Sequence, residues 1–168
     1  PRADLTVVGI ICLIYGKFEN KMSLNTHSMY FAYGSNLCVR QMNERCQDNV
    51  KVGMGILYGY KWIITKRGYA NVVKSLNDDV WGIIYKISSK DEKELDMYEG
   101  VKKKCYTKEN LEISIDGKIY NCLTYVDPIT NEGIPTITYI STINEGLSDS
   151  KLPEEYIEKY LSSKIKSQ

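Results

Sequence analysis

The stretch "MYFAYGSNL" at residues 29–37 constrains the fold most, because an apolar, aromatic run leads directly into a Gly-Ser-Asn turn. The run predicts a buried strand, and the following "NLCVRQMNERC" has apolar residues near helical spacing, which predicts a short helix. Glycine lets the chain turn sharply between the two elements. Backbone N–H groups at the start of such a helix can bind an anion. The alternative is an ordinary turn capped by Ser35 or Asn36.

Strand-like segments dominate the middle of the chain. The glycines of "VGMGILYGYKWIIT" (52–65) favour one bent strand or two strands, and "VWGIIYKI" (80–87) predicts another strand. "YTKENLEISI" and "KIYNCLTYV" flank Asp116 and Gly117, a dipeptide typical of a hairpin turn.

Helical signals lie between and after these strands. "SSKDEKELDMYEG" (88–100) predicts a helix, with capping-box spacing between Ser89 and Glu92 and an end at Gly100. "ITYISTINEGL" and "LPEEYIEKYLSSKI" predict two further helices, the second with Pro153 near its first helical position. This order of elements predicts an α+β fold whose strands close into a small barrel.

The first 28 residues differ from the rest. They include the 12-residue apolar run "LTVVGIICLIYG" (5–16), which is too short to span a bilayer and is followed by no signal-peptide cleavage site. We therefore expect residues 1–28 to be an N-terminal extension, disordered or non-native, and residues 29–168 to form the domain; 168 residues suit one domain with a real core.

Composition excludes several classes of function. A net charge of +1 leaves no electrostatic footprint for nucleic acid, so we expect neither a nucleic-acid nor a membrane partner. The single histidine, His27, argues against histidine-pair metal sites and most histidine-dependent triads. The five cysteines form no C-x-x-C pair, which favours free, dispensable thiols and a cytoplasmic protein. They are Cys12, Cys38, Cys46, Cys105 and Cys122.

Glu99 is the strongest candidate for acid/base chemistry. It stands at the predicted C-terminal end of a helix, where the helix carbonyls disfavour a negative charge. Burial would disfavour that charge further, and both effects raise a carboxyl pKa towards neutrality. The alternative interpretation is an exposed glutamate on a charged helix, as we expect for Glu92 and Glu94.

Taken together, "YFAYGSNL", "VWGIIYKI" and "LDMYEGV" followed by Tyr106 resemble the γ-glutamylcyclotransferase superfamily, including its AIG2-like branch. The resemblance covers roughly residues 29–160 and keeps the order of the motifs. It extends to "GLSDSKLPEEYIEKYL", which is similar to the tail of the animal enzymes.

The resemblance implies a small mixed β-barrel flanked by helices, with a pocket at one mouth. It implies an enzyme that cyclises the γ-glutamyl group of a small molecule to 5-oxoproline and releases an amino acid or amine, without metal or cofactor. Glu99 matches the family's acid/base. The residues matched to substrate binding are Tyr33, Gly34, Ser35, Asn36 and Leu37, through backbone groups, and the pocket tyrosines Tyr106, Tyr125 and Tyr139. A homodimer is left open.

Two other interpretations remain. A non-catalytic AIG2-like binding or regulatory module could use the same fold, because fold alone does not prove function. A hydrolase with Ser35 or Cys38 as nucleophile is disfavoured, since no G-x-S-x-G elbow is present. The sequence does not name the group released from the γ-glutamyl moiety.

Overall fold

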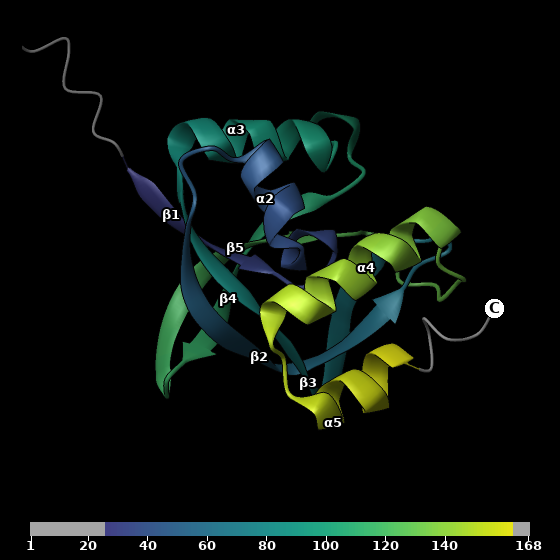
Figure 1. The fold of residues 1–168 in the computed structure, drawn as a ribbon. Helices are drawn as coiled ribbons and strands as arrows, with labels where there is room; N and C mark the ends of the chain where they lie inside the picture. Colours follow the sequence, from purple (N-terminus) through teal and green to yellow (C-terminus); the bar gives the residue numbers. More distant parts are fainter. Residues whose placement is uncertain (1–25, 163–168) are drawn as a thin grey trace, which may run out of the picture.

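The computed structural model describes residues 26–162, and five strands in this range form one closed barrel (Figure 1). Residues 1–25 of the expected N-terminal extension, with Cys12, lie outside the described residues, as do residues 163–165 of the last expected helix and residues 166–168 after it. The strands are β1 (His27–Ala32), β2 (Val50–Ile64), β3 (Ala70–Ser88), β4 (Thr107–Ile115) and β5 (Lys118–Val126).

The strand order around the barrel is β1-β3-β2-β4-β5. β1 is antiparallel to β3 and parallel to β5, where Tyr30 pairs with Leu123. The remaining pairs are antiparallel, so the barrel is mixed, and the predicted α+β fold is confirmed. Asp116 and Gly117 have φ values of 48° and 77° and join β4 to β5, as the hairpin signal predicts.

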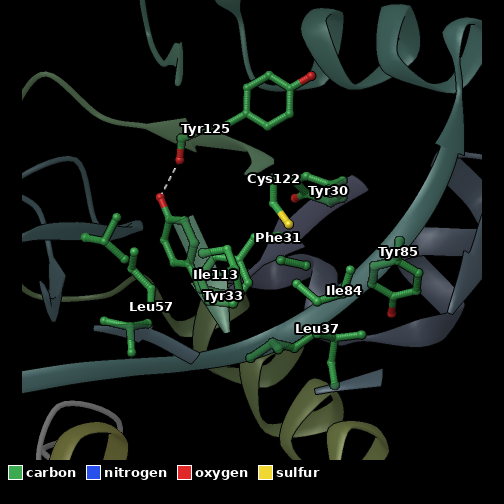
Figure 2. Close-up of a cluster of buried hydrophobic side chains, with 14 of the residues drawn as sticks. Tyr30, Phe31, Tyr33, Leu37, Leu57, Ile84, Tyr85, Ile113, Cys122 and Tyr125 are labelled. Carbon is green, nitrogen blue, oxygen red and sulfur yellow. Dashed lines mark hydrogen bonds between the residues drawn. The ribbon is translucent and has the colours of Figure 1, made fainter. Parts of the chain in front are cut away.

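Apolar side chains from all five strands fill the barrel. Figure 2 shows part of this core, in which Phe31, Leu57 and Ile113 are buried from three different strands. The tyrosines differ from the aliphatic residues because their hydroxyls need partners. Figure 2 also shows the hydroxyl of Tyr33 donating to the backbone oxygen of Tyr125, which ties the end of β1 to β5.

Helices cover one end and one side of the barrel (Figure 1). They are η1 (Ser35–Leu37), α2 (Val39–Arg45), α3 (Ser89–Tyr98), η2 (Val101–Lys103), α4 (Ile137–Ser150), α5 (Glu154–Tyr156) and the π-helical η3 (Ile157–Ser162). A Cβ atom at Gly146 of α4 would lie 2.7 Å from the backbone nitrogen of Cys38. α4 therefore rests directly on the turn that follows β1.

Two predicted caps differ from the structure. The capping box of α3 joins Ser88 and Asp91, one residue before the predicted pair, because β3 keeps Ser88 extended and the Asp91 carboxylate is buried beneath the helix. α2 is capped by the thiol of Cys38, which accepts from the N–H of Gln41, and not by Ser35 or Asn36. The predicted start of the last helix also differs, because Pro153 is the N-cap of α5 and not its first helical residue.

We predict that Gly82→Ala destabilises the barrel. A Cβ atom at Gly82 would lie 2.4 Å from the backbone oxygen of Ala32 and 2.6 Å from the ring of Phe31, so β1 would have to move. Overpacking of this kind costs about 1–3 kcal/mol. Urea unfolding followed by circular dichroism measures this loss. Gly53→Ala is the matched control, since its Cβ would meet nothing within 4 Å; equal stabilities for the two variants would contradict the prediction.

Candidate active site

A cavity of about 920 Å³ opens between the turn after β1, the end of α3 and the first half of α4. Every residue that the sequence analysis assigns to the site lines this cavity, except Leu37. The side chain of Leu37 is buried in the core, with 1% of its surface exposed. Segments that are far apart in the sequence therefore meet at this cavity.

Glu99 lies in the cavity wall, at the point where α3 ends. Its backbone N–H still donates to Leu95, while Gly100 turns the chain away with a φ of 64°. The side chain of Glu99 is only 17% exposed. Burial raises the pKa of this carboxyl, and the positive charges of Arg45 and Arg67 oppose the rise only in part. The predicted environment of a buried helix-end carboxylate is thus present.

Gly34 makes room for a tyrosine and does not relieve backbone strain. Its φ is −122°, which other residues also adopt, but a Cβ atom would lie 2.9 Å from the hydroxyl of Tyr139. That hydroxyl accepts a hydrogen bond of 3.1 Å from the backbone N–H of Ala70. Glycine at position 34 therefore lets the first turn of α4 hold the loop before β3.

The pocket tyrosines are neutral hydrogen-bonding groups. Burial raises the pKa of Tyr33, Tyr106 and Tyr139, so none of them is ionised near neutral pH. Tyr106 donates to the backbone oxygen of Ala70 at 2.9 Å. Tyr125 lines the cavity, and its hydroxyl donates at 2.7 Å to Asp96, which also lines the cavity.

Two arginines in the cavity wall were missed by the sequence analysis. Arg67 donates two hydrogen bonds to the buried carboxylate of Asp127, at 2.9 and 2.7 Å. Arg45 donates to the side-chain oxygen of Asn36 at 2.8 Å, and Gln41 donates to the same oxygen at 3.2 Å. The spacing of four residues between Gln41 and Arg45 on α2 is a signal that could have identified this pair.

Comparisons with known proteins identify the family. The mouse γ-glutamylcyclotransferase is 30% identical over 142 residues, covering 78% of this chain and 76% of the relative, and the human protein of the same name is 30% identical over 143 residues with the same shares covered. The chain belongs to the γ-glutamylcyclotransferase superfamily. A solved structure titled γ-glutamyl cyclotransferase superposes with a TM-score of 0.73 at 27% identity, covering 84% of this chain and 88% of that one. The model of the AIG2-like family matches residues 79–160. The γ-glutamylcyclotransferase fold expected from the motifs is therefore confirmed.

Two features of the described residues, 26–162, bear on other kinds of site. Within this range no helix has the length and apolar character needed to cross a membrane. The same range contains no cluster of three or more His, Cys, Asp or Glu side chains placed to hold a metal ion.

The position of Cys105 bears on the expectation that the thiols are free and dispensable. Cys38, Cys46 and Cys122 are fully buried, whereas Cys105 is half-buried and lines the cavity. We predict that N-ethylmaleimide blocks ligand entry through Cys105 and that Cys105→Ser stays active and resists the reagent. Residual activity on γ-glutamyl substrates, with mass spectrometry to locate the adduct, measures both effects. Equal inactivation of the wild type and of Cys105→Ser would contradict this.

Proposed function

We propose that this protein cyclises the γ-glutamyl group of a small molecule to 5-oxoproline and releases an amino acid or amine. The observation that carries the proposal is the Glu99 carboxyl, buried in the cavity wall beside the turn after β1, with a raised pKa. The relatives named γ-glutamylcyclotransferase support the reaction class.

Glu99 is the proposed acid/base. As a carboxylate it accepts a proton from the substrate's α-ammonium group, and the freed amine attacks the γ-carbonyl carbon of the same molecule. Glu99 then gives this proton to the departing nitrogen and the former γ-amide bond breaks. The ring nitrogen loses its second proton to the released amine, so the products are 5-oxoproline and an ammonium ion. The atoms balance without water. Because both reacting groups belong to one molecule, the cavity acts mainly by holding it in a folded shape.

The turn after β1 is the proposed site for the oxyanion. Leu37 and Cys38 already donate their N–H groups to Gly34 and Ser35 within the turn. Because the first N–H groups of a helical turn have no partner inside it, we infer that those of Gly34 and Asn36 are available to a ligand, whereas the N–H of Ser35 is directed at the hydroxyl of Tyr139. Donors fixed in this way stabilise negative charge that develops on the carbonyl oxygen during attack. This agrees with the role of the loop that the resemblance implies.

The remaining expectations stay predictions. They are a cytoplasmic location, the absence of a nucleic-acid partner, a homodimer and the boundary between residues 28 and 29. β1 begins at His27, two residues before that boundary. A non-catalytic binding module remains the competing function, and release of 5-oxoproline from a panel of γ-glutamyl compounds distinguishes the two.

We predict that Glu99→Gln lowers kcat about 10²–10⁴-fold, the usual range for loss of a general acid/base. Glutamine keeps the shape of the side chain but cannot carry the proton. Binding of 5-oxoproline should survive, because the substitution also removes a negative charge near the ligand's carboxylate. Turnover and calorimetric binding measure the two effects. Glu94→Gln is the matched control on the same helix, outside the cavity; a Glu99→Gln enzyme within a few-fold of the wild type would overturn the mechanism.

We predict an acid limb in the pH profile of kcat/KM that lies above pH 4.5, the ordinary carboxyl value. Glu99 must be ionised to accept the proton, and its pKa is raised by burial, so activity falls as the pH drops through that raised value. Initial rates in buffers of constant ionic strength give the limb. A profile that stays flat down to pH 4.5 would assign the proton to another group.

A further inference from the structure

Asn36 does not face a ligand with a free amide. Its side-chain oxygen accepts from Gln41 and Arg45, and its amide nitrogen donates to the hydroxyl of Tyr30 at 2.8 Å. Only 2% of its surface is exposed. Because a guanidinium can only donate, the amide oxygen must point at Arg45, and the amide nitrogen is then left to donate to the hydroxyl of Tyr30. Asn36 is therefore built to hold Arg45.

Most N–H donors of Arg45 make no hydrogen bond within the described residues. A guanidinium carries five N–H donors, and within the described residues Arg45 makes one hydrogen bond, from Nη1 to Asn36. Its guanidinium carbon lies 4.7 Å from the centre of the Tyr98 ring, which fixes its plane. The distance from Nη1 to the Oε1 atom of Glu99 is 3.9 Å, too long for a hydrogen bond. The side chain is 21% exposed and lines the cavity.

The other cations of the cavity are less suited to a ligand. Arg67 is neutralised by Asp127, whose carboxylate is fully buried, and it also donates to the backbone oxygen of Cys105. Lys102 and Lys103 are exposed on η2 at the rim. Arg45 is thus the cation whose position inside the cavity is fixed by a neutral partner.

We propose that Arg45, held by Asn36, binds the α-carboxylate of the γ-glutamyl group and thereby directs the α-ammonium group at Glu99. This rests on the proposed function. The carboxylate and ammonium of an α-amino acid share one carbon, so their two receptors must be neighbours, as Arg45 and Glu99 are. Arginine is also the side chain best shaped to hold a carboxylate with two parallel hydrogen bonds. The N–H groups of the turn are then left for the γ-carbonyl oxygen.

The test compares 5-oxoproline with its α-carboxamide, 5-oxoprolinamide, by calorimetry. Both probes contain the 5-oxoproline ring without the unknown released group, and only 5-oxoproline carries the carboxylate that Arg45 is proposed to bind. We expect the wild type to bind 5-oxoproline at least about tenfold more tightly, the size of one charged hydrogen bond. Arg45→Gln should bring the ratio close to one, and Asn36→Leu should lower it by releasing Arg45. A loss of fold would weaken both ligands alike, whereas a lost carboxylate contact weakens only the acid.

Arg40→Gln is the matched control, because Arg40 is an exposed arginine of the same helix, paired with Glu44 and Glu145. It should leave the ratio unchanged. Arg45→Lys keeps the charge without the planar fork and should give an intermediate ratio, which covers the case in which Arg45→Gln does not fold. A wild type that releases 5-oxoproline, together with unaltered ratios in the Arg45 and Asn36 variants, would overturn this inference and leave the proposed function standing. A wild type that neither releases nor binds 5-oxoproline would overturn both.

Discussion

The pairing of β1 with two other strands is the interaction on which the candidate site depends. β1 is antiparallel to β3 along its length and parallel to β5 at Tyr30, so it closes the barrel. In a closed barrel each strand is paired on both sides, which fixes its position relative to its neighbours. The turn that carries Gly34 and Asn36 follows directly from this strand. Closure therefore sets the position of the turn in the cavity relative to Glu99.

The contact between α4 and the turn after β1 is the second constraint on the geometry of the site. A side chain at Gly146 would overlap the backbone at Leu37 and Cys38, so the helix lies as close to the turn as a helix can. Tyr139 is seven residues earlier, about two helical turns, and thus lies on the same face of α4. That face brings its hydroxyl to Gly34 and Ala70. Two glycines, one on each segment, allow this approach.

Local patterns are sufficient to predict most strand residues, the hairpin turn and the end of α3, because each depends on residues adjacent in sequence, but residues 70–79 of β3 were not predicted as strand. These patterns fail where the conformation of a residue depends on a segment that is distant in sequence. The cap of α3 moves to Ser88 because β3 extends that far, and Leu37 turns from the cavity into the core beneath α4. Glu99 and the tyrosines could be placed at the site through family motifs. Arg45 could not, since its position depends on the buried amide of Asn36, which the fold places between Arg45 and the hydroxyl of Tyr30.

The balance of charge around Glu99 favours an enzyme over a binding module. A carboxylate in a mostly buried place costs several kcal/mol unless it is well paired, and among the described residues its nearest cationic nitrogen, on Arg45, is 3.9 Å away. The charge of Arg67 is already neutralised by Asp127. Among the described residues the largely buried carboxyl of Glu99 thus has no hydrogen-bonded partner, and a carboxylate in this position would be relieved by a proton from a bound ammonium group. Because that transfer removes two charges from a poorly solvated cavity, it is favoured there more than in water. A module that only binds could use the carboxylate to pair with the ligand's ammonium group, but the proton transfer between them serves only an enzyme.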